Sequence, residues 1–152
     1  MSTALNVQPA PLLLIPTANT QFLMTASAVG SDERVLVIGP NAFDHLMGLA
    51  RNGCKSASAA RRAALCRGEE DGADVIWLTG IDRIDADLTA TVGHLDAPRI
   101  VVLELTRDCA KARLPNLLGT LRNKGLADQS IRKCGGCTVV VATRPAWLRR
   151  VI

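Results

Sequence analysis

The residues best placed for chemistry are those of the turn Gly39-Pro40-Asn41. They follow a continuous apolar run, Val35 to Ile38, and precede a pattern with helical spacing. A strand, a tight turn and a helix in this order form the nucleotide site of many open α/β sheets. The turn lacks the Lys-Ser/Thr pair of a phosphate-binding loop and the glycine spacing of a dinucleotide fingerprint. It therefore predicts a ligand site without specifying the ligand.

Cys134 and Cys137 form a C-x-x-C pattern around two glycines. Such a pair can supply half of a zinc site, but a structural zinc needs four ligands and no second C-x-x-C or histidine pair follows. Redox pairs of this spacing lie at a helix N-terminus, whereas this pair lies between two strand patterns. We therefore expect a hairpin turn flanked by two thiols, with no metal bound.

The two histidines give little support for nucleophilic catalysis. His45 lies early in one helical pattern and His94 near the end of another. No Ser or Cys is visibly paired with either, so the catalytic residues are unknown.

Length and composition indicate one globular domain. The chain has 152 residues, of which 48% are hydrophobic and only 3% aromatic, so its core must be aliphatic. A chain of this length forms one core and little more. We expect a single domain over residues 1–152, in which residues 1–18, with three prolines, form an irregular arm.

Charge is divided unevenly along the chain. Residues 1–110 hold nine Lys/Arg and thirteen Asp/Glu, a net −4, whereas residues 111–152 hold nine basic residues and one acid, a net +8. The basic C-terminal third suggests an acidic partner, of which nucleic acid is one kind, and its alternative is a solvated basic face.

The N-terminal residues and the cysteines predict a cytoplasmic protein. Met1 to Gln21 has no basic region typical of a signal peptide, and the apolar run Leu12 to Ile15 is too short to cross a membrane. The five cysteines are odd in number and widely spaced, which favours reduced thiols.

The elements that position these residues follow a β–α rhythm. The first expected helix covers Thr20–Val29, and the second follows the cap Asn41, with apolar residues at Phe43, Leu46, Met47 and Ala50. The others are Ala59–Arg67 capped by Ser58, the stretch after the cap Asp85, and the stretch after Pro115. The expected strands are Val35–Ile38, a weak Gly53–Ala57, Asp74–Leu78, Pro98–Leu105, Gln129–Cys134 and Thr138–Thr143. The last two have no room for a helix between them, so they must form an antiparallel hairpin. The fold class is α/β, with a mostly parallel Rossmann-like sheet between two helical layers.

This order of elements resembles the class I S-adenosylmethionine-dependent methyltransferase fold. The family closes with a helix, a glycine, a strand, a hairpin and a last apolar strand, which correspond here to Leu117–Leu121, Gly125, Ser130–Lys133 and Thr138–Ala142. The resemblance covers roughly Thr20 to Pro145. The third strand of the family is missing or shortened between Ser58 and Gly72.

The first cofactor motif of that family is an acid followed by Gly-x-Gly-x-Gly. Here these positions fall on Val37, Gly39, Asn41 and Phe43, so only the first glycine agrees. Glycines allow the backbone to approach the ligand, and a side chain narrows that space. Phe43 is large enough to fill the place of the third glycine.

The remaining motifs of the family are also incomplete. An acid at the end of the second strand binds the ribose hydroxyls in the family, and the stretch Cys54–Ala60 has none, although Ser56 or Ser58 could make one such bond. The Asp/Asn-Pro-Pro-aromatic motif of amino-group methyltransferases is absent after Leu78. The resemblance implies S-adenosylmethionine across Gly39, Pro40 and Asn41, its ribose near Ser56 and Ser58, and its adenine near Leu78, Thr79 and Gly80.

These observations predict a small methyltransferase-like protein with weakened or lost cofactor binding. Losing the charged partner of the ribose costs about 2–3 kcal/mol, the scale of a hydrogen bond to a charged group. The alternative is a non-catalytic interaction or regulatory module, with nucleic acid bound by the basic C-terminal third.

Overall fold

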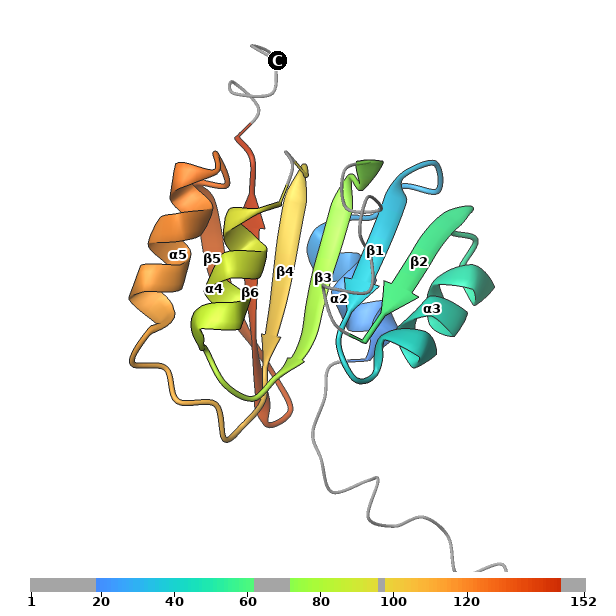
Figure 1. The fold of residues 1–152 in the computed structure, drawn as a ribbon. Helices are drawn as coiled ribbons and strands as arrows, with labels where there is room; N and C mark the ends of the chain where they lie inside the picture. Colours follow the sequence, from blue (N-terminus) through green and yellow to red (C-terminus); the bar gives the residue numbers. More distant parts are fainter. Residues whose placement is uncertain (1–18, 62–71, 96–97, 146–152) are drawn as a thin grey trace, which may run out of the picture.

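The computed structural model describes residues 19–61, 72–95 and 98–145, and a six-stranded sheet forms its centre (Figure 1). The strands are β1 (Arg34–Ile38), β2 (Ser56–Ala60), β3 (Val75–Ile81), β4 (Ile100–Leu105), β5 (Asp128–Cys134) and β6 (Cys137–Thr143). Across the sheet their order is β2-β1-β3-β4-β6-β5. The first four are parallel, whereas β6 is antiparallel to both β4 and β5. The predicted mostly parallel sheet with a C-terminal antiparallel hairpin is confirmed.

Helices of the described residues cover both faces of this sheet (Figure 1). They are α2 (Thr20–Ser27), α3 (Ala42–Arg51), α4 (Ala86–Gly93) and α5 (Leu114–Asn123). Leu23 and Leu49 of α2 and α3 pack on one face, and Val92 and Leu117 of α4 and α5 pack on the other. The three predicted layers are therefore present. None of the helices in the described parts of the chain is long and apolar enough to cross a membrane.

The interior strands follow the apolar runs of the sequence. Val35 to Ile38 lies between β2 and β3 and is at most 7% exposed, as expected of a strand covered on both faces. β3 continues past the predicted end at Leu78 to Ile81, with a register shift before Ile81 against β4. The reason is that Gly80, just past the predicted end, adopts a φ of +63° and bends the strand without ending it.

The second strand is displaced from its predicted position. A strand was expected at Gly53–Ala57 and a helix after Ser58, whereas β2 covers Ser56–Ala60 and Ser58 pairs with Leu36. The predicted role of Ser58 as a helix cap is therefore wrong. The Ser and Ala residues of β2 have no apolar periodicity. The segment is extended because β1 provides backbone groups for it to hydrogen-bond with. The remainder of the expected helix, residues 62–67, lies outside the described residues.

Helix α3 is turned relative to its predicted orientation. The buried residues are Ala42, His45 and Leu49, whereas Phe43 is 69% and Met47 47% exposed. Helix α2 lies against its other side at Gly48, where a β-carbon would lie 2.6 Å from Oγ1 of Thr20. This close contact between the helices fixes the rotation, which the apolar spacing of α3 alone did not indicate.

Of two predicted helix caps, one is present in the structure and the other is absent. Asp85 caps α4, because its Oδ1 accepts a hydrogen bond of 2.9 Å from the backbone of Leu88. Asn41 occupies the N-cap position of α3 but makes no side-chain cap, so the predicted capping role is wrong. Its φ of −103° and ψ of 17° differ from the extended backbone that a capping side chain needs.

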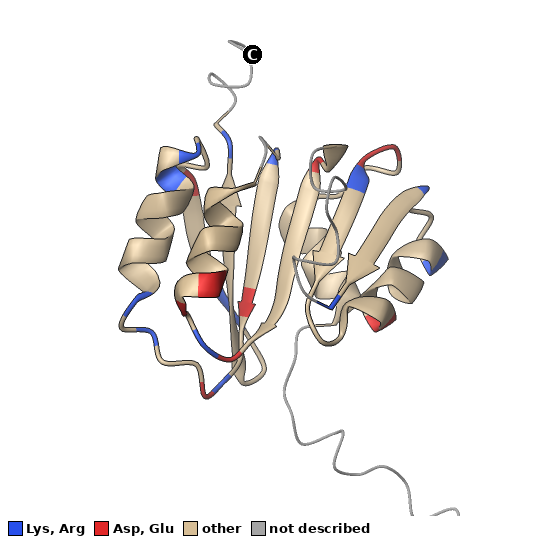
Figure 2. Ribbon diagram, in the orientation of Figure 1, with Lys and Arg blue, Asp and Glu red and all other residues tan. Residues whose placement is uncertain are grey.

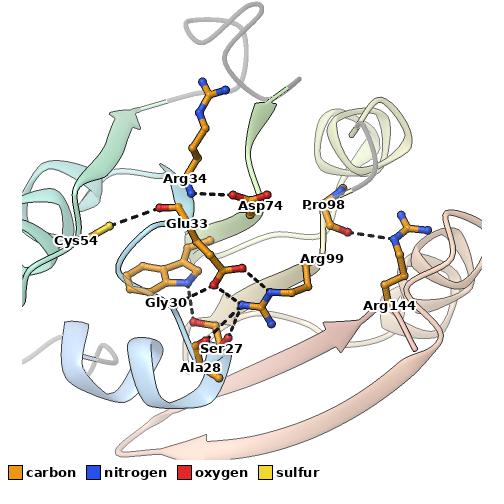
Figure 3. A network of polar contacts seen from close by, with 11 residues as sticks. Ser27, Ala28, Gly30, Glu33, Arg34, Cys54, Asp74, Pro98, Arg99 and Arg144 are labelled. Atoms are coloured by element: carbon orange, nitrogen blue, oxygen red, sulfur yellow. Dashed lines mark hydrogen bonds and ion pairs between the residues drawn. The ribbon is translucent and has the colours of Figure 1, made fainter. Parts of the chain in front are cut away.

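A polar network ties the start of β4 to α2 and β1 (Figure 3). Arg99 donates from Nε and Nη2 to the two carboxylate oxygens of Glu33, at 2.7 and 2.8 Å, and from Nη2 to the carbonyl of Ser27 at 3.0 Å. The Ser27 hydroxyl accepts a hydrogen bond of 3.2 Å from Nε1 of Trp77, which lies in the core. These contacts hold the edge of the sheet opposite to the predicted ligand site.

Candidate ligand site at the carboxyl edge of the sheet

The turn after β1 is held by the chain itself. Gly39 has a φ of +148°, a region open almost only to glycine, and its backbone N–H donates to the carbonyl of Ala60 at 2.9 Å. A β-carbon on Gly39 would collide with the carbonyl and hydroxyl oxygens of Thr79. The absence of a side chain at Gly39 therefore lets the turn pack against β3, so this space is filled by the protein itself.

The end of β3 interlocks with the same turn from the other side. A β-carbon on Gly80 would lie 2.7 Å from Cγ of Pro40. The N–H of Gly80 donates at 2.9 Å to Oε1 of Glu104, which is fully buried on β4, and the Thr79 hydroxyl donates at 3.3 Å to the carbonyl of Ile38. The backbone donors of both glycines are thus satisfied by protein groups.

Two neighbouring hollows lie beside these interlocked turns, and they share Pro40 and Arg61. The first has a volume of about 290 Å³, and its described lining is Pro40, Ala42, Phe43, Ala59, Ala60 and Arg61. The second has a volume of about 170 Å³, and its described lining is Ile38, Gly39, Pro40, Arg61, Leu78, Thr79, Gly80, Ile81, Arg83, Leu88 and Thr91. Phe43 is 69% exposed and lines the first hollow, and that it fills the place of a family glycine stays a prediction.

The structure brings together most, but not all, of the predicted site residues. Five of them line the second hollow, namely Gly39, Pro40, Leu78, Thr79 and Gly80. Asn41 lines neither hollow within the described residues. Ser56 and Ser58 lie level with Arg34 and Leu36 of β1, and they line a third, separate hollow of about 150 Å³. The two serines predicted to contact a ribose therefore lie apart from the interlocked turns.

Sequence reasoning missed the two arginines of the site. Arg61 follows the last residue of β2, and Arg83 lies in the loop between β3 and α4. Both are exposed, and within the described ranges neither has a hydrogen bond or an ion pair. A single arginine after a weak strand carries no signal, and only the parallel sheet brings these two residues to one hollow.

His45 is part of the core rather than of the site. Its Nδ1 lies 3.0 Å from the Thr20 hydroxyl, and its ring meets Trp77 edge-on with 5.8 Å between the ring centroids. Burial lowers its pKa, and the charges of Glu104 and Asp44 oppose that shift. His45 therefore favours the neutral form. It lines neither of the two hollows.

The cysteine pair forms the predicted hairpin. Cys134 and Cys137 face each other across the turn between β5 and β6, and the thiol of Cys137 donates to the carbonyl of Cys134 at 2.8 Å. Burial, assisted by the charge of Glu104, raises the pKa of the Cys137 thiol to about 11. Among the described residues no three His, Cys, Asp or Glu side chains gather as metal ligands would. The absence of zinc stays a prediction.

The basic C-terminal third is spread over several elements in its described part, 111–145 (Figure 2). Arg144 is only 8% exposed and donates to the carbonyls of Pro98 and Lys124, so it supports the fold. Arg132 and Lys133, on the edge strand β5, are exposed. Arg149 and Arg150 lie outside the described residues.

Comparisons with known proteins give matches by structure alone. Neither protein-family models nor curated protein sequences match this chain. A solved structure of a candidate tRNA methyltransferase of Streptococcus pneumoniae is similar, with a TM-score of 0.54 and 14% identity over 84% of this chain and 70% of that one. A ribosomal-protein methylase of Lactobacillus delbrueckii subsp. bulgaricus is similar with a TM-score of 0.51 and 12% identity, over 82% and 76%. This chain has the class I methyltransferase-like fold.

At two positions where the resemblance implies an acid, this chain has other residues. The first-motif acid falls on Val37, which is fully buried in β1. The ribose-binding acid is expected at the end of the second strand, and β2 ends here with Ala60 followed by Arg61. The charge at this strand end is therefore positive where the resemblance leads us to expect a negative one.

Proposed function

We propose that this methyltransferase-like protein is a non-catalytic ligand-binding or regulatory module in which S-adenosylmethionine binding is weakened or lost. One observation carries the proposal. The charged side chains in the described lining of the two hollows are Arg61 and Arg83, and no carboxylate accompanies them. The free thiols of the described cysteines suit a reducing compartment, which supports a cytoplasmic location as part of this proposal.

The charge of the methyl donor argues against this site. S-adenosylmethionine carries a sulfonium, an ammonium and a carboxylate, a net charge of +1. Two like charges 4 Å apart repel by about 1 kcal/mol in water and by about 4 kcal/mol near a protein surface. This repulsion adds to the loss of the ribose-binding acid, which is about 2–3 kcal/mol. Together these terms weaken binding by several factors of ten.

The backbone of the site also offers few donors to a cofactor. The N–H of Gly39 is bound to Ala60, and that of Gly80 is bound to Glu104. A ligand that used these donors would have to break hydrogen bonds within the protein, one of them to a buried carboxylate. Such bonds are among the strongest in proteins.

Calorimetric titration with S-adenosylmethionine and S-adenosylhomocysteine tests the proposal. We expect no binding of the first at micromolar concentration, and any residual affinity to be higher for the second, which lacks the sulfonium charge. Arg61→Asp should improve binding of S-adenosylmethionine, whereas Arg51→Asp, the same charge change on α3 away from both hollows, should not. Micromolar affinity of the wild type for S-adenosylmethionine would contradict the proposal.

A second candidate function is contact with nucleic acid through the basic C-terminal third. It is supported by the exposure of Arg132 and Lys133 on β5, an edge strand of the sheet. Neither side chain has a hydrogen bond or ion pair to the described residues, so both can meet phosphate groups.

A further inference from the structure

The two hollows at the carboxyl edge differ in chemistry although they adjoin. The first is lined by apolar groups, apart from Arg61 at the border. The second adds Arg83 and the hydroxyls of Thr79 and Thr91. A ligand that bridges Pro40 and Arg61 would therefore meet apolar surface at one end and positive charge at the other.

The apolar hollow offers a flat aromatic surface. Phe43 lines it from α3 and is 69% exposed, and Pro40 and Ala59 lie in the same lining. A phenyl ring beside small side chains suits the face of another planar ring, and stacking of a base on an aromatic side chain contributes about 1–3 kcal/mol. Met47 is similarly exposed on α3 but lies outside the described lining, so it provides a comparison.

The second hollow holds two guanidinium groups that have no partner in the described residues. At the opposite edge of the sheet, by contrast, Arg99 binds Glu33 and Arg144 binds two carbonyls. The two acids that flank Arg83 in sequence, Asp82 and Asp85, form no ion pair with it in the described residues, and Asp85 is occupied as the cap of α4. Arg61 and Arg83 come from different strand ends and line one hollow, so their charge is available to an anion. Guanidinium groups bind phosphate through paired, charge-assisted hydrogen bonds.

Volume indicates that one ligand uses both hollows. Small-molecule sites usually span about 300–1,000 Å³. The hollows measure about 290 and 170 Å³, so each alone is below the usual volume of a small-molecule site. The two side by side lie within the usual range. The ligand that fits has a planar ring at one end and an anionic group at the other.

We propose that the carboxyl edge binds a nucleoside monophosphate, with its base against Phe43 and its phosphate between Arg61 and Arg83. This inference deepens the proposed function, because it assigns a ligand class to the same edge of the sheet. The phosphate is held by side chains. This agrees with the structure, in which the backbone N–H groups of Gly39 and Gly80 are already hydrogen-bonded within the protein. No bond is formed or broken in the ligand.

Titration with adenosine 5′-monophosphate, followed by calorimetry and by backbone amide NMR shifts, tests this site. Arg61→Gln and Arg83→Gln should each weaken binding by about tenfold or more, the scale of one charge-assisted hydrogen bond. Phe43→Ala should weaken it by about fivefold or more through lost stacking. Adenosine, which lacks the phosphate, should bind more weakly to the wild type and be unaffected by the arginine substitutions.

The matched controls are Arg51→Gln and Met47→Ala, which remove an arginine and a large apolar side chain from the same helix as Phe43. Both should bind adenosine 5′-monophosphate as the wild type does. Equal losses in these controls, equal binding of adenosine, or no binding at millimolar concentration would overturn the inference. A single-stranded oligoribonucleotide that bound a hundredfold more tightly through Arg83 would overturn it in favour of a polymer.

Titration with S-adenosylmethionine in the same series separates this inference from the proposed function. Micromolar binding of S-adenosylmethionine would contradict the proposed function, whatever the result with the nucleotide. Absence of binding for both ligands would leave the proposed function standing and overturn only the nucleotide site.

Discussion

Thr79 packs so closely against Gly39 that its carbonyl and hydroxyl oxygens occupy the space of a β-carbon on that residue. The glycine that would bring a backbone near a cofactor instead brings two strand ends together. Because Gly80 and Pro40 interlock beside this contact, the carboxyl edge of β1 and β3 is a packed junction with hollows at its flank.

Gly39→Ala should lower the free energy of unfolding by about 3 kcal/mol or more, through backbone strain and collision with Thr79. Gly53→Ala is the matched control, since Gly53 also has a positive φ, +88°, but no atom lies within 4 Å of the added β-carbon. It should cost about 1–2 kcal/mol, the strain of the backbone alone. Urea unfolding of both variants measures the difference. Equal losses would show that contact with Thr79 is unimportant.

Glu33→Gln should make stability less dependent on acid pH. Burial would raise the pKa of Glu33, but hydrogen bonds from Arg99 and Gly30 outweigh it, and the pKa lies below the ordinary 4.5. A lowered pKa in the folded state stabilises the protein above about pH 4.5, and this contribution is lost as pH falls through the folded pKa. In urea unfolding the variant should therefore be less stable than the wild type at about pH 7, and the difference should shrink as pH falls below about 4.5. A difference that stays the same as pH falls would contradict this.

His45 predicts a second pH dependence, in the neutral range. Burial lowers the pKa of His45 below 6.5, against the weaker opposing charges of Glu104 and Asp44. The unfolded chain then binds the proton more readily, so stability falls as pH drops below about 6.5. In His45→Gln this fall between about pH 7 and pH 5.5 should be reduced, while the lost Thr20 contact costs about 1 kcal/mol throughout. His94→Gln, an exposed histidine at the end of α4, is the control.

The cysteine hairpin predicts unequal thiol reactivity and no zinc. Cys137 is 2% exposed and its pKa is raised to about 11, so iodoacetamide should label it far more slowly at about pH 8 than the partly exposed Cys54. Peptide mapping of the labelled protein gives the two rates. Stoichiometric zinc by elemental analysis, lost in Cys134→Ser, would contradict the expected absence of metal.

Nucleic-acid binding by the basic C-terminal third should depend steeply on salt, because bound phosphates release counterions. Arg132→Gln together with Lys133→Gln should weaken binding to any sequence and reduce the salt slope by about 2. Arg149→Ala with Arg150→Ala should also weaken binding without altering sequence preference. Anisotropy titrations at several salt concentrations measure both. Absence of binding at low salt would leave the solvated basic face as the explanation.

The sequence by itself determined the strands of the interior and the class of fold. Val35–Ile38 and Ile100–Leu105 are runs that must be buried on both faces, and no helix fits between Cys134 and Cys137. The alternation of strands and helices then leaves few arrangements for the sheet. The helix cap at Asp85 was also predictable, because the interaction spans only three residues.

Tertiary structure decided the strand at Ser56–Ala60, the rotation of α3 and the lining of the site. Ser and Ala have no strong local preference, so β2 forms because β1 provides its hydrogen-bonding edge. α3 buries His45 instead of Phe43 because α2 lies close at Gly48. Arg61 and Arg83 are far apart in the chain, and they meet because parallel strands bring their carboxyl ends to one edge of the sheet.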